Sequence, residues 1–197
     1  MNNINLLLAK EEDIYNEKYS NLSLIEKEIT DKSITNCQFT KINLNETIFK
    51  NVFLEDITFI NCDLSNTQFI ECNFRNLKFQ NCKLLGTNML NLHLTKVNIN
   101  KCLCKYLNII DSKIKELTII DSNCQESNFY NIELKKVIFT NCNFNDAEFV
   151  KTSLNGIDFS SSNISGIRMT IDSLKGIKVN QFQALELTSL LGIEIVE

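Results

Sequence analysis

Eight cysteines and a single histidine are the residues of this chain best suited to chemistry, because thiolates and imidazoles bind metals and attack substrates. Some of the cysteines recur at multiples of twenty residues: Cys62, Cys82, Cys102 and Cys142. A straight column of thiols lacks the tetrahedral convergence that zinc requires, and a buried cysteine behaves as a small hydrophobic residue. We therefore interpret this cysteine column as core packing and expect no metal site.

Catalytic motifs are also missing from the sequence. His93 lies between Leu92 and Leu94, and we expect it to point outward without a partner. The chain contains no glycine-rich phosphate loop, nucleophile elbow or HExxH motif. We therefore expect a protein that is not an enzyme and uses no cofactor.

The composition indicates a globular protein and excludes few partners. Twenty basic residues stand against twenty-four acidic ones, which gives a net charge of -4. The apolar run at residues 6–9 is too short for a signal-peptide core, and no stretch approaches the roughly 20 apolar residues of a membrane span. We expect a cytoplasmic protein with free thiols, no membrane contact and no direct binding of nucleic acid.

A period of five residues organises most of the chain. Every fifth position from Leu24 to Met169 is apolar, and no insertion breaks the register. The position two places earlier is small or compact, and the residue between the two is usually polar. This in-out-in step is typical of a strand, and the two remaining residues are rich in asparagine and glycine, which tolerate tight turns.

A second period of twenty residues sets the number of sides. Phe39, Phe59 and Phe79 fall on it, as do Leu44 and Leu64. Four five-residue units per coil place like residues above one another. The spacing therefore predicts a four-sided all-β solenoid of about 7–8 coils.

These repeats resemble the pentapeptide-repeat family, whose motif is A(D/N)LXX. "CDLSN" at 62–66, "CNFRN" at 72–76 and "AEFVK" at 147–151 are good instances. The resemblance implies a right-handed quadrilateral β-helix. We expect a lead-in segment over 1–18, the β-helix over 19–171, and a C-terminal helix with a short strand over 172–197.

The C-terminal segment predicts a helix that caps the solenoid. Asn180 and Gln183 are spaced as a capping box, and Gly192 suits the helix end. On such a helix Phe182, Leu185 and Leu190 fall into one sector, and Ala184, Leu187 and Leu191 fall into a second one. One sector can close the coil, while the other suits a two-fold partner. The simpler alternative is that both sectors serve only to cap the coil, without a dimer. The expected homodimer contacts are Phe182, Leu185, Leu187, Leu190, Leu191, Ile193 and Ile195.

The ending "GIKVNQFQALELTSLLGIEI" is similar to the tail of Qnr-type quinolone-resistance proteins and MfpA-like proteins. This resemblance implies a dimer that binds DNA gyrase or topoisomerase IV by imitating duplex DNA, and that protects the enzyme from quinolones. However, the coil sums to a neutral charge over its four faces, which favours the alternative of a scaffold with an unrelated protein partner. Phe53 occupies an outward position and is a candidate partner contact.

Overall fold

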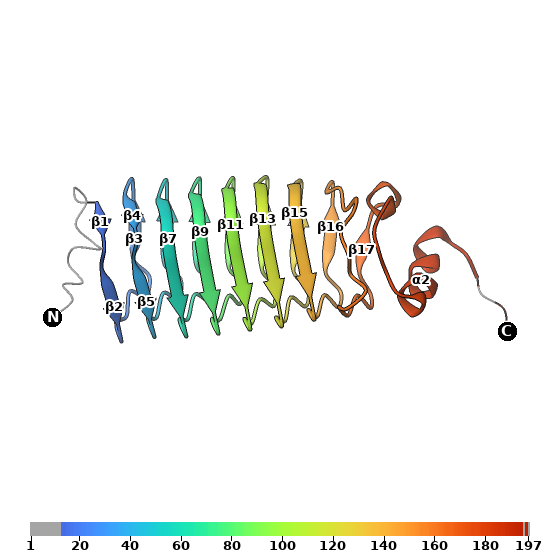
Figure 1. Cartoon of the computed structure of the whole chain (residues 1–197), viewed down its shortest axis with the longest axis horizontal. Coiled ribbons are helices and arrows are strands. Elements are labelled where there is room, and N and C mark those ends of the chain that lie inside the picture. The colour runs from blue at the N-terminus through green and yellow to red at the C-terminus, as the bar shows by residue number, and fades with distance from the viewer. Residues whose placement is uncertain (1–12, 195, 197) are drawn as a thin grey trace.

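The chain winds into a parallel β-solenoid that ends in a short helix (Figure 1). The computed structural model describes residues 13–194 and residue 196. Paired residues are twenty positions apart, as Phe74 is from Leu94 and Leu94 from Ile114. The pairing extends from Ile14 to Lys178, which corresponds to about eight coils. The all-β solenoid predicted from the sequence is confirmed.

The strands are short except where one strand continues around a corner of the coil. In chain order they are β1 (Ile14–Tyr15), β2 (Lys18–Ser20), β3 (Glu28–Thr30), β4 (Ser33–Thr35), β5 (Gln38–Thr40), β6 (Ile48–Lys50), β7 (Phe53–Ile60), β8 (Gln68–Ile70), β9 (Asn73–Gln80), β10 (Asn88–Leu90), β11 (His93–Asn100), β12 (Asn108–Ile110), β13 (Lys113–Ile120), β14 (Asn128–Tyr130), β15 (Glu133–Thr140), β16 (Glu148–Val150) and β17 (Arg168–Met169). The helices are η1 (Ile171–Leu174), α2 (Gln181–Thr188) and η2 (Ser189–Leu191).

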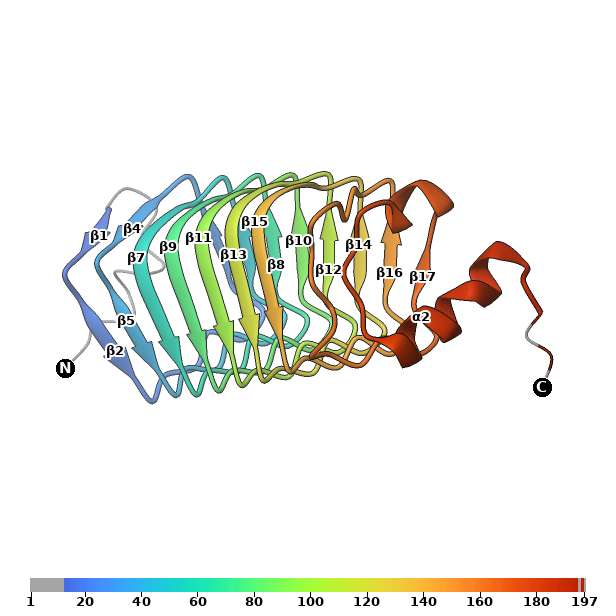
Figure 2. The same ribbon diagram turned by 45° about the vertical axis from the view of Figure 1, so that its right-hand side comes forward.

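Each coil has four sides, as the twenty-residue period predicts. One side is the sheet that contains β3, β6 and β8 and ends at β17. Two adjoining sides belong to a second sheet, whose long strands β7 to β15 bend over a corner (Figure 2). The fourth side is a row of isolated parallel bridges from Ser23 to Asn163.

The corners explain why asparagine and glycine recur. Asn61, Asn66 and Gly86 have φ of 53°, 56° and 61°, which is the left-handed region that those residues tolerate. Corner amides still donate to the next coil, as Gly86 N does to Lys105 O at 3.0 Å and Asn66 N to Leu85 O at 2.7 Å. The absence of proline fits this pattern, because proline would remove such a donor.

The apolar column fills the interior. From Leu24 to Ile164 every fifth residue is buried except Leu134, which is partly buried. The phenylalanines stack as ladders: the ring centroids of Phe39 and Phe59 are 5.0 Å apart, and those of Phe59 and Phe79 are 5.1 Å apart. The predicted stacking of like residues is therefore confirmed.

The C-terminal helix covers the end of the coil. Asn180 Oδ1 accepts hydrogen bonds from Phe182 N and Gln183 N, and Gln183 Oε1 accepts one from Asn180 N at 2.9 Å. This capping box and the left-handed Gly192, with φ of 69°, match the ends predicted for the helix. Gln183 and Leu187 are the buried residues of α2, so they form the side that faces the solenoid.

Candidate partner-binding surfaces

The cysteine column lies inside the coil and is packed rather than reactive. All eight cysteines are buried and free. Cys82 N donates to Cys102 Sγ at 3.4 Å, and the Cys82 thiol also faces the carbonyl of Phe59. Burial raises the pKa of Cys72 and of Cys142 to about 11, and hydrogen bonds with Cys102 and Cys62 raise the pKa of Cys82. The hydrogen bonds with Cys82 lower the pKa of Cys62 and of Cys102, so it is the raised pKa of Cys72, Cys82 and Cys142 that makes those thiols poor nucleophiles, while all eight are out of reach of solvent.

No cluster of three or more metal-ligating side chains occurs among residues 13–194 and 196. His93 is exposed, as predicted, on strand β11. It lines a shallow groove of about 380 Å³ together with Lys113, Lys115 and Lys135. The groove also contains Glu133, which pairs with Lys113 at 3.4 Å, so its charged side chains are three lysines and one carboxylate.

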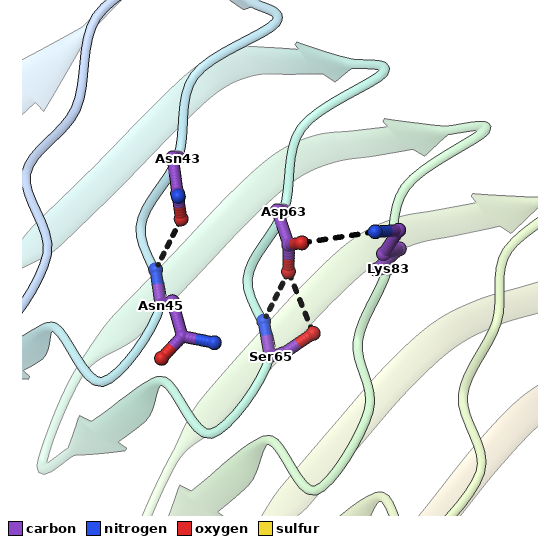
Figure 3. Close-up of polar contacts among 5 residues, drawn as sticks. All are labelled: Asn43, Asn45, Asp63, Ser65 and Lys83. Carbon is purple, nitrogen blue, oxygen red and sulfur yellow. Dashed lines mark hydrogen bonds and ion pairs between the residues drawn. The ribbon is translucent and has the colours of Figure 1, made fainter.

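The row of isolated bridges carries an ordered set of polar turns (Figure 3). Asn43 Oδ1 accepts a hydrogen bond from Asn45 N at 3.0 Å, and one coil later Asp63 Oδ1 accepts from Ser65 N at 3.0 Å. Asp63 also forms an ion pair with Lys83 at 3.2 Å. Burial alone would raise the pKa of the Asp63 carboxyl, but the Ser65 hydrogen bonds and Lys83 together hold that pKa below its usual value.

The same row is where an acidic stripe would have to lie, because it has the most negative net charge of the four sides. Lys83 neutralises Asp63, and Lys105 pairs with Glu126 at 3.0 Å. The negative charge is therefore interrupted by basic residues. Duplex DNA presents a phosphate charge about every 1.7 Å, so this side copies its electrostatic pattern poorly.

The C-terminal end exposes a group of apolar side chains, which we call the C-terminal apolar patch: Phe182, Leu185, Leu191 and Ile193. Their exposed fractions are 70%, 54%, 50% and 52%. The other predicted contacts differ: Leu187 is 8% exposed and Leu190 packs partly against the coil core. Ile195 lies outside the described residues. The structure thus divides the predicted set into a cap and an exposed part, while the dimer itself stays a prediction.

Phe53 is half-buried at the start of β7, where it pairs in register with Ser33 and Asn73. Its side chain forms one step of an outward row that continues through His93 and Lys113. Its role as a partner contact stays a prediction.

One feature of the surface has no counterpart in the sequence pattern. The backbone ladder between β15 and the next coil is broken, although Leu134 and Leu154 keep the five-residue register. Periodicity reports which side chains face inward, and it does not report whether two coils are in hydrogen-bonding contact.

The structure resembles several solved structures. QnrB1 after trypsin treatment, described as a plasmid-mediated fluoroquinolone resistance protein, has a TM-score of 0.51 at 16% identity, covering 94% of this chain and 99% of QnrB1. HetL, involved in heterocyst differentiation in Nostoc sp. strain PCC 7120, has a TM-score of 0.41 at 12% identity, covering 86% of this chain and 89% of HetL. At these identities the likeness to QnrB1 shows the fold. No curated protein matches the sequence.

Within residues 13–194 and 196, none of the helices has the length and apolar character to traverse a bilayer. Two family models match the repeats: "Pentapeptide repeat region" over residues 32–109 and "Pentapeptide repeats (8 copies)" over residues 121–170. The two matches together span more than half of the sequence and agree with the four-sided coil. The chain therefore belongs to the pentapeptide-repeat family.

Proposed function

We propose that this protein is a non-catalytic scaffold that pairs with a second copy and binds another protein along its coil. The observation that carries the proposal is the C-terminal apolar patch. Gln183 and Leu187 already close the end of the coil, while Phe182 and Leu185 remain mostly exposed. Clustered exposed apolar side chains typically mark an interface between proteins.

The first candidate partner is a type II topoisomerase, either DNA gyrase or topoisomerase IV. Support comes from the Qnr-like and MfpA-like C-terminal tail and from the similar fold of QnrB1. Purified protein is expected to restore gyrase supercoiling in the presence of a quinolone. If supercoiling is unchanged at every ratio of protein to enzyme, gyrase is not the target, and a parallel assay with topoisomerase IV tests the second enzyme.

The second candidate is a partner unrelated to topoisomerases, and the charge distribution favours it. Lys83 and Lys105 interrupt the acidic side of the coil, and the long-strand side carries Lys113, Lys115 and Lys135. A DNA-mimicking surface would need an unbroken row of negative charge. A reproducible partner recovered by affinity capture, without any topoisomerase and confirmed by binding of the two purified proteins, supports this candidate.

A further inference from the structure

The hydrogen-bond ladder of the solenoid is interrupted at one place. Along one side of the coil, each strand begins with an amide that donates to the preceding coil: Phe53 to Lys32, Asn73 to Val52, His93 to Cys72, Lys113 to Leu92 and Glu133 to Ser112, at 2.8–3.2 Å. The next member of this series would join Ser153 to Ile132. Among the described residues that bond is not formed.

The break extends along the whole of β15. Within the described part of the chain, no backbone hydrogen bond links residues 133–140 to residues 153–160. Asn141 N donates instead to the Ser161 side chain at 3.4 Å. Residues 153–160 instead form backbone hydrogen bonds with the segment that follows in the next coil. Gly156 N donates to Gly176 O at 2.9 Å, and Phe159 N donates to Lys178 O at 2.8 Å.

The opposite sides of the same two coils remain joined. Phe144 N donates to Asn163 O at 2.7 Å, and Glu148 N donates to Ser127 O at 2.8 Å. Strand β14 pairs with β16 in full register. The coils therefore separate on one half of the perimeter, which leaves β15 with one paired edge, toward β13, and one free edge.

The free edge exposes part of the core. Leu134 and Val137 are partly buried, whereas Ile114 and Leu117, one coil earlier, are 2% and 1% exposed. Ile138 is 56% exposed. A cavity of about 140 Å³ lies between Leu134, Lys136 and Val137 on one side and Ser153, Asn155, Gly156 and Ile157 on the other. A Cβ at Gly156 would meet open space, which agrees with the gap.

The charges beside this edge are mainly basic. Lys135 points outward from β15 and continues the groove lined by Lys113 and Lys115. Lys136 pairs with Glu116 at 3.3 Å. Lysines on an edge strand discourage unselective pairing. They leave the edge open to an extended segment with two apolar residues three positions apart, to cover Leu134 and Val137, and an acidic residue opposite Lys135.

We infer that the free edge of β15 binds the C-terminal segment of a second copy as an added strand. The sequence there reads Ile193, Glu194, Ile195, Val196, Glu197, in which Ile193 and Val196 are three residues apart, as Leu134 and Val137 are, and Glu194 follows Ile193 as Lys135 follows Leu134. Ile193 is 52% exposed and Val196 is 92% exposed, so both apolar side chains are available. Both views show α2 at the end of the solenoid opposite the N-terminal strand β1 (Figures 1 and 2).

An added strand would supply the free edge of β15 with hydrogen-bond partners and with apolar cover. Main-chain hydrogen bonds to an added strand provide affinity, and alternate side chains provide selectivity. An acidic residue such as Glu194 opposite Lys135 fixes the register by charge, and the apolar neighbours cover Leu134 and Val137. This inference rests on the self-association in the proposed function, and it adds a second contact that is independent of Phe182 and Leu185.

Hydrogen exchange of the full-length protein tests the inference at single amides. In complete coils, the inward and corner residues donate to the next coil, as Leu84 does to Leu103 and Gly86 to Lys105. The corresponding amides of β15, Leu134, Lys136 and Phe139, are expected to exchange rapidly in dilute protein. They gain protection when a synthetic peptide of residues 192–197 is added, and also when the protein concentration is raised. A peptide with both glutamates replaced by lysine gives no protection.

A matched pair of variants assigns the site. Lys115 and Lys135 occupy registered outward positions on β13 and β15. Lys135→Glu is expected to weaken peptide binding by about three- to tenfold, and Lys115→Glu by less than about twofold. Phe182→Asp leaves peptide binding unchanged, so loss of the helix contact is distinguishable from loss of the strand contact. Protection that is concentration-independent without peptide means that the gap closes within one chain, and it overturns the inference, as does equal weakening by both lysine variants.

Discussion

The Gln183 side chain closes the last coil by donating from Nε2 to Phe159 O at 3.0 Å, while Phe159 itself is fully buried. The same amide donates to Ser162 O at 2.6 Å. Phe159 O also accepts from Ser162 N at 2.8 Å, whereas Ser162 O accepts no backbone amide among the described residues, because Gln183 N donates to Asn180 Oδ1 instead of continuing the ladder. The helix therefore ends the ladder by replacing missing amides with one side chain, rather than by apolar cover alone.

We expect Gln183→Leu to destabilise the protein by about 2 kcal/mol, because it leaves the buried Ser162 carbonyl without a donor and removes one of the two donors to Phe159 O. The loss should begin at the C-terminal coils, since each coil contacts only its neighbours. Urea unfolding followed by circular dichroism measures the midpoint, and hydrogen exchange locates the loss. Gln181→Leu, at an exposed position of the same helix, should stay within about 0.5 kcal/mol. Equal midpoints for the two variants would contradict this role of Gln183.

Periodicity in the sequence predicts the solenoid well because its cause is local and repeated. Each inward residue, from Leu24 to Ile164, needs an apolar side chain, and each corner, such as Asn66, needs a residue that tolerates a positive φ. Both requirements can be recognised from the sequence, because each concerns the residue type at a single repeated position. The number of residues per coil follows from the stacking of like side chains, as at Phe39 and Phe59.

The surfaces are less predictable, because they depend on what lies opposite. The sectors drawn from helical spacing placed Phe182 and Leu190 together, whereas the structure exposes Phe182 and packs Leu190 partly against the core. The polar Gln183 takes the central capping place, which a count of apolar residues cannot reveal. The free edge of β15 is likewise invisible in the sequence, since the break concerns backbone groups that every residue carries.

Replacing Phe69 by alanine is expected to destabilise the coil by about 3–5 kcal/mol, because the cavity would lie in a fully packed ladder. Its ring stacks on Phe49 at 4.9 Å and meets the edge of Phe74 at 5.1 Å. Thermal and urea unfolding provide the comparison. Leu103→Ala, at a residue that is 47% exposed, serves as the control and should cost well under about 1 kcal/mol. A small loss in the free energy of unfolding of Phe69→Ala would contradict the prediction and would show that the core relaxes around the missing ring.

Stability should fall at alkaline pH. Burial raises the pKa of Cys72 from its ordinary value of 9.0 to about 11, and burial raises the pKa of Tyr19 to about 12. Since the unfolded chain ionises these groups more readily, their contribution is complete below about pH 9 and is lost as pH rises toward the folded pKa. For Cys72 the change is about 2 kcal/mol between pH 9 and 11.

Urea midpoints from pH 8 to pH 11 measure this loss, and Cys72→Ala should make the decline shallower. The control is Cys37→Ala, whose thiol pKa is raised by burial to a smaller degree. A stability that is flat across this range would mean that the thiols reach solvent in the folded state.

The last prediction concerns self-association through the C-terminal apolar patch. Phe182→Asp combined with Leu185→Asp places two charges where the exposed fractions are 70% and 54%, so the fold has no need of either side chain. A charge buried in an interface without a partner is costly, and we expect the dimer to weaken by at least a hundredfold. Sedimentation velocity over a range of concentrations measures the change. Gln181→Asp combined with Glu186→Gln keeps the charge of the helix and changes only polar exposed positions, so it should leave the association constant within about twofold. If the aspartate variant and this control sediment alike, the patch does not hold two copies together, and the exposed side chains must serve a different partner.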